Sequence, residues 1–374
     1  MTPRPAVALY FSRLGHAGGG AERRITELAG ALALRGFNVH LASWDKETSE
    51  DFYPLAPAVT RHKLGTTGGW SGKLLRVHRL AGLLRRNKID VLIGFVMSGD
   101  KTVFAAARLA GVRLIAAERN APEMYRLRYN AVQRTTSFAC LHLCDRITVQ
   151  FKDYIHGYPA SLRDRIAVIA NPVHPAQLTA KPAEPNPAGR YTLLAAGRLD
   201  PLQKRFDHLL LAFTALADLH PDWDLRLIGD GPHEHQLRQM TAELGLTRRV
   251  RFQPTTSDVF SAYAEAHLFA IPSLWEGFPN VLAEAMSHGL PAVGYRQVQG
   301  VAQLIEDGVS GWLADGRSDP GAFAASLSAA MSEAGERKRR GRQAQLAMAA
   351  YAPATQYDFW VQLILSCMER KIRQ

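Results

Sequence analysis

The chain has 374 residues, a hydrophobic content of 47% and a net charge of +11. This length suits two domains, and the composition is typical of an ordinary soluble globular protein. No stretch approaches the ~18 uninterrupted apolar residues of a membrane-spanning helix. With only three cysteines, a disulfide scaffold is not expected, and a reducing, cytoplasmic location is.

The positive charge is confined to the first half of the chain. Residues 1–187 hold 26 Lys and Arg against 14 Asp and Glu, whereas residues 188–374 hold 19 against 20. Such asymmetry indicates that one domain faces a polyanion. We do not expect nucleic acid to be the partner, because the basic stretch at 73–88 has no aromatic residues for stacking on bases. The remaining candidate is an anionic membrane surface, which the protein would bind peripherally at its inner face.

The first half alternates predicted strands with predicted helices. Short buried strands are predicted at residues 6–10, 38–42, 91–96, 113–117, 145–149 and 166–169. A glycine-rich turn that includes Gly18, Gly19 and Gly20 follows the first of them. Glycines there would let the backbone approach a phosphate or a sugar closely. The turn lacks the G-x-G-x-x-G spacing, which counts against a nicotinamide-dependent enzyme.

Residues 73–88 predict an amphipathic helix. Its apolar stripe would comprise Leu74, Val77, Leu80, Ala81 and Leu84, and the cations Arg76, Arg79, Arg85 and Arg86 lie mostly away from that stripe. Two interpretations remain open. The helix is either a solvated outer helix or a surface that contacts the phosphates of lipid headgroups or of a diphosphate-bearing acceptor.

Two further groups of polar residues stand out in the first half. Glu118, Arg119 and Asn120 follow a predicted strand at its carboxyl end, where open α/β sheets bind ligands. Cys140 and Cys144 flank a histidine, but their spacing fits no common zinc pattern. We therefore predict a ligand-facing role for the first group and an inert buried helix for the second.

A proline-rich linker at 172–189 separates the halves, and the second half repeats the same pattern. Its strands are predicted at 191–196, 224–228, 250–252 and 268–271, and its helices at 206–219, 234–244 and 258–265. A last helix is predicted near 354–373, buried against another element. The chain is therefore expected to form two doubly wound α/β domains that face one another across a cleft.

The most informative stretch follows the strand at 268–271. Gly277 and Pro279 predict a tight turn, Asn280 a helix N-cap, and the residues from Val281 onward a helix. A helix N-terminus in this position is an anion site, and phosphate is the usual ligand. Glu276 on the turn and Glu284 inside the helix can then address different ends of one elongated ligand, such as a sugar and a ribose joined by a diphosphate.

Cations are predicted beside this anion site. Arg198 and Lys204 stand on a loop that follows a strand, so they should open at the same carboxyl edge as Glu276. Such groups can stabilise a departing diphosphate without a metal. Asp222 and Asp224 resemble a metal-binding D-x-D pair, but they precede a strand at the opposite edge, so no metal site is predicted.

These motifs together resemble the GT-B glycosyltransferases of the large retaining family 4. The matching stretches are Gly18–Glu22, Asn171–Val173, Ala196–Lys204, Leu227–Pro232 and Pro272–Ala285, which follow the family's order over nearly the whole chain. The Glu118-Arg119-Asn120 set resembles the branch that builds polysaccharides or lipid-linked oligosaccharides. Many relatives carry a histidine at that strand end, and a glycine where this chain has Arg205.

The resemblance implies a role for each matching position. Glu276 would hold the donor sugar, and Arg198 and Lys204 would bind the diphosphate and stabilise the leaving group. Glu284 would hold the ribose. The remaining donor-binding residues would be Gly19, Gly20, Phe252, Gln253, Gly277, Phe278, Pro279, Asn280 and Val281. The acceptor side would involve Glu118, Arg119, Asn120, Arg76 and Arg79.

The resemblance also implies domain boundaries and a reaction. Residues 1–171, completed by the helix at 354–374, would form the acceptor-side domain, and residues 190–353 would bind the nucleotide sugar. The expected reaction moves a hexose or N-acetylhexosamine from a nucleotide diphosphate, with UDP as the expected nucleotide, to a lipid-linked glycan. The expected reaction retains the anomeric configuration and needs no metal or other cofactor. The alternative on the same fold is a UDP-sugar epimerase.

Overall fold

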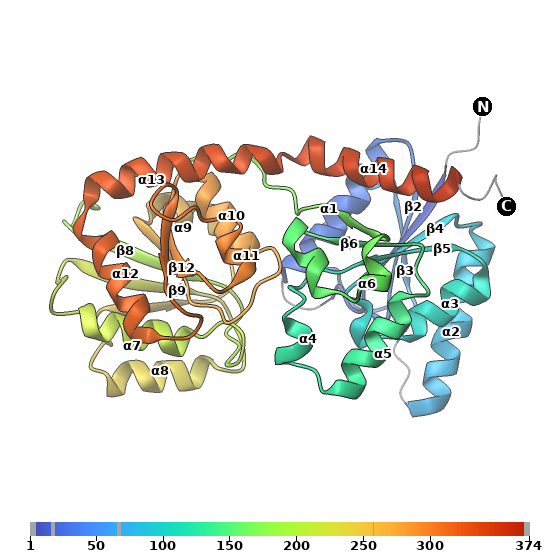
Figure 1. Cartoon of the computed structure of the whole chain (residues 1–374), viewed down its shortest axis with the longest axis horizontal. Helices are drawn as coiled ribbons and strands as arrows, with labels where there is room; N and C mark the ends of the chain where they lie inside the picture. Colours follow the sequence, from blue (N-terminus) through green and yellow to red (C-terminus); the bar gives the residue numbers. More distant parts are fainter. Residues whose placement is uncertain (1–4, 16–18, 66–68, 257, 370–374) are drawn as a thin grey trace. The chain divides into compact units, whose positions relative to one another are not determined.

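The computed structural model describes residues 5–15, 19–65, 69–256 and 258–369. The chain forms two compact units: Met1–Asn171 together with Ala354–Gln374, and Pro172–Pro353. Each unit is built on one parallel β-sheet flanked by helices (Figure 1). We call them the first and the second unit.

The first unit contains a seven-stranded sheet of order β3-β2-β1-β4-β5-β6-β7. Its strands are β1 (Ala6–Tyr10), β2 (Asn38–Ser43), β3 (Val59–Lys63), β4 (Val91–Phe95), β5 (Arg113–Ala117), β6 (Arg146–Val149) and β7 (Ile166–Val168). The helices between them are α1 (Gly20–Leu34), α2 (Gly69–Arg86), α3 (Thr102–Ala110), α4 (Met124–Leu127), α5 (Ala131–Leu141) and α6 (Ala160–Arg163). Because all pairings are parallel, the carboxyl ends of the strands meet at one edge of the sheet.

The last helix of the chain completes the core of the first unit. Helix α14 (Pro353–Glu369) buries Tyr357, Trp360 and Ile364 in the same apolar cluster as the strands β1, β2 and β4. Trp360 stacks on Phe95 with ring centroids 6.3 Å apart. Two segments from opposite ends of the sequence therefore share one hydrophobic core.

The second unit contains a six-stranded parallel sheet of order β10-β9-β8-β11-β12-β13. Its strands are β8 (Tyr191–Ala196), β9 (Trp223–Ile228), β10 (Val250–Gln253), β11 (Leu268–Ile271), β12 (Ala292–Tyr295) and β13 (Gly311–Ala314). Its helices are α7 (Phe206–Leu216), α8 (Glu234–Glu243), α9 (Val259–Glu265), α10 (Asn280–Ser287), α11 (Gln299–Ala302), α12 (Pro320–Ser332) and α13 (Ala334–Ala347). The strand order reverses between β8 and β11, and the loops after such strands are where open α/β sheets bind ligands.

Several details differ from the sequence predictions. Leu74 on α2 is 74% exposed rather than buried, whereas Leu80, Ala81 and Leu84 are buried as predicted. Strands β3, β12 and β13 are not predicted by the sequence patterns. In the part of the chain that the structure describes, no helix is both long and apolar enough to cross a membrane.

Candidate active site

Two loops at the carboxyl edge of the second sheet are locked together by close backbone packing. A side chain at Gly229 would place its Cβ 1.9 Å from the carbonyl oxygen of Gly197, and one at Gly231 would place it 2.4 Å from that of Leu199. Gly229 also has a φ of 150°, a conformation that only glycine adopts readily. The Leu199 N–H donates to the carbonyl of Asp230 at 2.9 Å. The loop that carries Arg198 and Lys204 is therefore held in one shape.

Lys204 meets Glu276 at this edge. The Lys204 Nζ lies 2.6 Å from Glu276 Oε1, and the two side chains are 17% and 7% exposed. The loops beneath them are joined as well, because the Leu274 N–H donates to the Gln203 carbonyl at 2.7 Å and Gln203 Nε2 donates to the Trp275 carbonyl at 3.1 Å. A cation and a carboxylate separated by 72 residues in sequence are thus held side by side and largely out of water.

Helix α10 begins directly after this ion pair. Its first residue is Asn280, and its N-cap is Pro279, whose side chain offers no hydrogen-bond acceptor to the first turn. The predicted N-cap role of Asn280 was wrong by one position, because Pro279 is the last non-helical residue and Asn280 already belongs to the helix. A helix N-terminus next to a lysine favours the binding of an anion such as phosphate.

Glu284 lies one turn into α10 and is 6% exposed. The Tyr263 hydroxyl, from the neighbouring helix α9, donates to Glu284 Oε2 at 3.4 Å. Four residues of helix separate Asn280 from Glu284, which amounts to about 6 Å along the axis. Glu276 therefore precedes the start of the helix and Glu284 follows it by one turn.

The other predicted donor-side residues in the second unit take different positions. Gly277, Phe278 and Pro279 are buried in the turn before α10, and Val281 occupies the first turn of the helix. The Arg198 side chain is exposed on its loop.

Phe252 and Gln253 end strand β10 and point to opposite sides of the sheet, as successive strand residues do. The Phe252 ring is covered by the guanidinium of Arg238, 4.6 Å away. Gln253 Oε1 accepts a hydrogen bond from Arg226. Because both are already in contact with arginines of their own unit, any contact with a nucleotide base would have to share or displace these partners.

In the first unit, the glycine-rich turn leads into helix α1. Gly19 is the N-cap and Gly20 the first helical residue. A Cβ on Gly19 would lie 2.1 Å from Glu22 Oε2, so a larger residue would require the Glu22 side chain to move. Gly18 lies outside the described residues.

Glu118 and Arg119 are engaged within the first unit. The carboxylate of Glu118 accepts hydrogen bonds from the hydroxyls of Tyr125, at 2.5 Å, and Tyr158, at 3.3 Å. Burial raises the pKa of Glu118 above its ordinary value, and the two tyrosine hydrogen bonds oppose that shift only in part.

Arg119 packs over Phe95 and Trp360, with the guanidinium carbon 5.4 and 5.7 Å from the ring centroids. It also donates to Asn171 Oδ1 at 3.3 Å. Burial lowers the pKa of Arg119 to about 10, so it stays cationic at neutral pH. Glu118 and Arg119 therefore stiffen this strand end, and Asn120, which follows them, is partly exposed.

The arginines of α2 lie close to the body of the first unit. Arg76 Nη1 lies 3.8 Å from Asp100 Oδ2. The guanidinium carbon of Arg76 is 5.3 Å from the centre of the Trp44 ring. Arg79 donates to the Leu64 carbonyl at 2.7 Å, and Arg85 donates to the Leu109 carbonyl. Arg79, Arg85 and Arg86 remain exposed, so part of their charge still faces solvent.

Cys144 and Asp224, each with a second cysteine or aspartate close by in the sequence, have surroundings in the structure that suit roles other than metal binding. Cys144 is 1% exposed, and burial raises the pKa of its thiol. Asp224 forms ion pairs with Arg190 and Arg249. No group of three or more His, Cys, Asp or Glu side chains is arranged to hold a metal among the described residues.

Sequence reasoning did not identify Gln203, Tyr263 or Asp230 as parts of this edge. Gln203 bridges two loops, and Tyr263 contacts a candidate carboxylate. Asp230 Oδ2 accepts the Thr255 N–H at 2.8 Å and so fixes the loop after β10. Only the Gly-Asp-Gly-Pro pattern at 229–232 signalled one of them, since its glycines require a close backbone approach.

The sequence matches two family models that follow one another along the chain. Residues 18–177 match the model described as Glycosyltransferase Family 4, and residues 177–347 match the model described as Glycosyl transferases group 1. Together the two models span residues 18–347. They meet near the start of the second unit, so each model corresponds to one parallel sheet.

Individual proteins agree with this match. An uncharacterized glycosyltransferase of Haemophilus influenzae is 28% identical over 317 residues, which cover 83% of this chain and 86% of the relative. The amylovoran biosynthesis glycosyltransferase AmsD of Erwinia amylovora is 24% identical over 348 residues, which cover 91% of this chain and 95% of that protein.

Among solved structures, Alr3699/HepE of Anabaena in complex with UDP and glucose superposes with a TM-score of 0.77 at 17% identity, covering 97% of this chain and 100% of that one. An identity this low speaks to the fold alone. The predicted GT-B fold is confirmed. Each of the two α/β units is built on a parallel sheet, and the two family models and the solved structure agree with that architecture. The chain therefore belongs to the family 4, group 1 glycosyltransferases.

Proposed function

We propose that this glycosyltransferase moves a hexose or N-acetylhexosamine from a UDP-sugar to a polysaccharide or lipopolysaccharide-type acceptor that is carried on a membrane lipid. One observation carries the donor half of the proposal: Lys204 Nζ and Glu276 Oε1 lie 2.6 Å apart, directly before the N-terminus of helix α10. This arrangement suits a ligand with a phosphate next to a polyhydroxylated ring. A nucleotide sugar has both.

Negative charge develops on the departing diphosphate when the bond between the sugar and the phosphate breaks. Lys204, Arg198 and the N–H groups at the start of α10 would stabilise that charge, Lys204 as a compact cation and Arg198 through a planar fork. Preorganised groups of this kind stabilise a transition state without further reorganisation. We infer that the reaction needs no metal ion, because these cations supply the charge that a metal would otherwise supply.

The two carboxylates would hold the two ends of the donor. Glu276 would accept hydrogen bonds from the sugar hydroxyls, and its contact with Lys204 keeps it oriented for that role. Glu284, about 6 Å further along the helix, would accept hydrogen bonds from the ribose hydroxyls. The choice of UDP is supported by the Anabaena structure, which holds UDP and glucose.

Retention of the anomeric configuration is proposed from membership in the family. The measurement is the anomeric proton coupling of the fresh product by NMR. An α-linked donor should give an α-linked product. A β-linked product would contradict this part of the proposal and leave the donor site unaffected.

The acceptor class is proposed from the relatives and from the charge of the first half. AmsD is named for amylovoran biosynthesis, and a Salmonella typhimurium relative over 47% of this chain is named as a lipopolysaccharide 1,6-galactosyltransferase. The exposed cations of α2, Arg79, Arg85 and Arg86, would rest on anionic headgroups. Asn120, at the strand end held by Glu118 and Arg119, would face the acceptor.

The membrane part of the proposal can be tested by vesicle sedimentation. Changing Arg79, Arg85 and Arg86 to Gln should release the protein from anionic vesicles, since each cation near such a surface contributes about 1 kcal/mol. Arg76→Gln should matter less, because Arg76 already contacts Asp100. Equal sedimentation of the triple variant and the unmodified protein would remove the α2 surface from the proposal.

The donor is tested first by thermal shift with UDP, GDP, ADP and UDP-sugars, with and without EDTA. A ligand at 100 times its dissociation constant adds about 2.7 kcal/mol of stability, so a UDP shift that survives EDTA is expected. Glu284→Ala should abolish the shift, and Glu243→Ala, an exposed change on α8, should preserve it. Conversion of a UDP-sugar with no acceptor present would instead support the epimerase alternative.

A further inference from the structure

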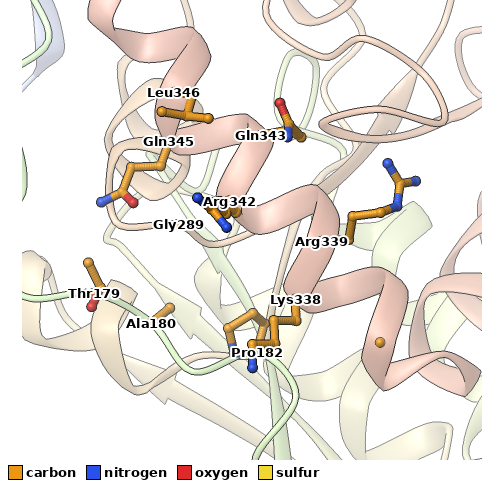
Figure 2. A pocket seen from close by; sticks show the side chains of 11 residues that line it. Thr179, Ala180, Pro182, Gly289, Lys338, Arg339, Arg342, Gln343, Gln345 and Leu346 are labelled. Carbon is orange, nitrogen blue, oxygen red and sulfur yellow. The ribbon is translucent and has the colours of Figure 1, made fainter.

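A second cationic surface lies on the second unit, in a hollow of about 590 Å³. Figure 2 shows the hollow between the segment at 179–182 and one face of helix α13, with Lys338 and Arg342 directed toward that segment. Thr179, Gly289 and Gln345 also line it. Its lining contains cations, amides and small residues and no carboxylate.

The hollow is separate from the candidate active site. Gly289 lies just beyond the C-terminal end of α10, whereas the Lys204–Glu276 pair lies at the N-terminal end of that helix. Eight residues of α-helix span about 12 Å. A ligand in the hollow would therefore occupy the opposite edge of the sheet from a donor held at the start of α10.

Both walls of the hollow are fixed to the end of α10. A Cβ on Gly341 would lie 2.2 Å from the Gly289 carbonyl oxygen, so helix α13 rests directly on the backbone there. Gln345 Nε2 donates to the Ser287 carbonyl at 3.1 Å. On the other wall, the Ala180 N–H donates to the His288 carbonyl at 2.7 Å. The hollow is thus built into the fold.

Two of the three cations that line the hollow differ from the other arginines of the same helix. Arg339, which also lines the hollow, and Arg340 both pair with Glu336. Arg337 is buried and donates to the carbonyls of Pro182, Ala330 and Met331. Lys338 and Arg342, in contrast, form no ion pair with any described residue. Two cations left unpaired beside a carboxylate-free hollow favour an anionic ligand.

We propose that this hollow binds a phosphate group. Arg342 offers a planar fork that matches two phosphate oxygens, Lys338 a compact charge, and Thr179 a hydroxyl. The phosphate would come either from a soluble phosphate ester or from the headgroup of an anionic lipid. In the second case the second unit would contact the membrane through its own surface, independently of the arginines of α2.

The experiment compares two double variants with the same loss of charge. Lys338→Gln with Arg342→Gln removes the cations of the hollow. Lys152→Gln with Arg248→Gln removes two exposed cations elsewhere and is the control. Both are made in an Arg198→Gln, Lys204→Gln background, so that phosphate binding at the candidate active site does not contribute.

Inorganic phosphate is titrated by calorimetry, and vesicles of phosphatidylcholine with and without 30% phosphatidylglycerol are tested by sedimentation. The hollow variant should lose at least about tenfold in affinity for one of the two probes relative to the control, because charge-assisted hydrogen bonds are removed. A loss of affinity for phosphate alone identifies a soluble phosphate ester as the ligand. A loss of affinity for the anionic vesicles identifies a lipid headgroup as the ligand.

Equal binding of both probes by the two variants would overturn the proposal. The proposal would fail equally if the hollow variant melted at a lower temperature but bound both probes like the control. Lys338 and Arg342 would then act only on the C-terminal carbonyls of α10, which a nearby cation stabilises. Because the titration uses the background variant, failure of the hollow and failure of the proposed donor site give separate results.

Discussion

The carboxyl edges of the two sheets have the same architecture but use their polar residues differently. In the first unit, the carboxylates near the strand ends accept hydrogen bonds from their own unit. Glu118 is held by two tyrosines, and Asp100 accepts hydrogen bonds from Tyr10, Trp44 and Thr102. In the second unit, Lys204 and Glu276 form an ion pair beside the N-terminus of a helix. The carboxylates of the first edge are thus held by neutral hydrogen-bond donors, whereas the carboxylate of the second edge is held by a cation.

The difference shows why similar strand-end motifs should not be given similar roles. A buried carboxylate with several internal donors would lose those bonds if it turned toward a ligand, and a buried group without partners is costly. At the second sheet, the Lys204–Glu276 pair is itself a contact within one unit, so a ligand there would share or replace it. Internal partners therefore have to be considered together with position when a role is assigned to a strand-end residue.

The largest effect should come from Lys204. We expect Lys204→Ala to lower kcat about 10²–10³-fold, the loss seen when one preorganised donor is removed from a developing negative charge. The melting temperature should also fall, because Glu276 is left largely buried without its cation, so the rates are compared at a temperature at which both proteins remain folded. Initial rates with a UDP-sugar and an acceptor measure this, with Lys152→Ala as the matched control. A rate close to that of the unmodified protein would place Lys204 outside the reaction.

A smaller effect, on stability rather than rate, is expected from Tyr125. Tyr125→Phe removes the 2.5 Å hydrogen bond to Glu118 and should lower the free energy of unfolding by about 1–3 kcal/mol. Tyr129→Phe is the control, since its hydroxyl meets the neutral Ser98 hydroxyl at 3.1 Å rather than a buried carboxylate. If both variants unfolded at the same urea concentration, the Glu118 cluster would not stiffen the first edge.

The pH dependence of stability should reveal the same cluster. Burial raises the pKa of Glu118 above its ordinary value of 4.5, so the folded protein keeps this proton where the unfolded chain has lost it. The proton on Glu118 contributes to the free energy of unfolding in full below pH 4.5, and this contribution disappears as the pH rises through the raised pKa. The free energy of unfolding should therefore fall over that pH range, and Glu118→Gln should remove this part of the fall. Urea unfolding from about pH 4 to about pH 8 measures it, and parallel curves for the two proteins would contradict the shift.

The smallest effect is expected at Arg205, next to Lys204. Its φ of 49° is left-handed, a conformation that costs a non-glycine residue about 1–2 kcal/mol. Arg205→Gly relieves that strain but loses the hydrogen bond to Ser318 Oγ at 3.0 Å, so the net change in stability should stay within about 1 kcal/mol. A change in KM for the donor would show that the Arg205 side chain also affects donor binding at the carboxyl edge of the second sheet.

The fold could be predicted to a large extent because buried parallel strands leave clear apolar runs. The strands missed were those without such a signal. Strand β3 lies at the sheet edge and reads Val-Thr-Arg-His-Lys, with only Val59 buried. Strands β12 and β13 read Ala-Val-Gly-Tyr and Gly-Trp-Leu-Ala, and a glycine among so few residues weakens the strand signal. The start of α2 was misjudged because periodicity placed Leu74 on the stripe but could not show that nothing covers it.

The candidate site could be predicted in outline but not in its contacts. A loop after β8 and a loop after β11 must open at the same edge, which is why Lys204 and Glu276 could be paired in advance. The Tyr263–Glu284 contact depends on how α9 packs against α10, and no spacing in the sequence contains that information. The partners of Glu118 were equally invisible, since Tyr158 is 40 residues away.

The placement of α14 has a consequence for how the protein is made. The core of the first unit includes Trp360 and Ile364, which a ribosome adds only after the whole second unit has been synthesised. Residues 172–353 contain a complete sheet of their own. They can therefore fold while the core of the first unit still lacks the side chains of α14. We therefore expect the first unit to be the last to finish folding, and a messenger truncated near residue 353 to yield one folded half and one that needs chaperones.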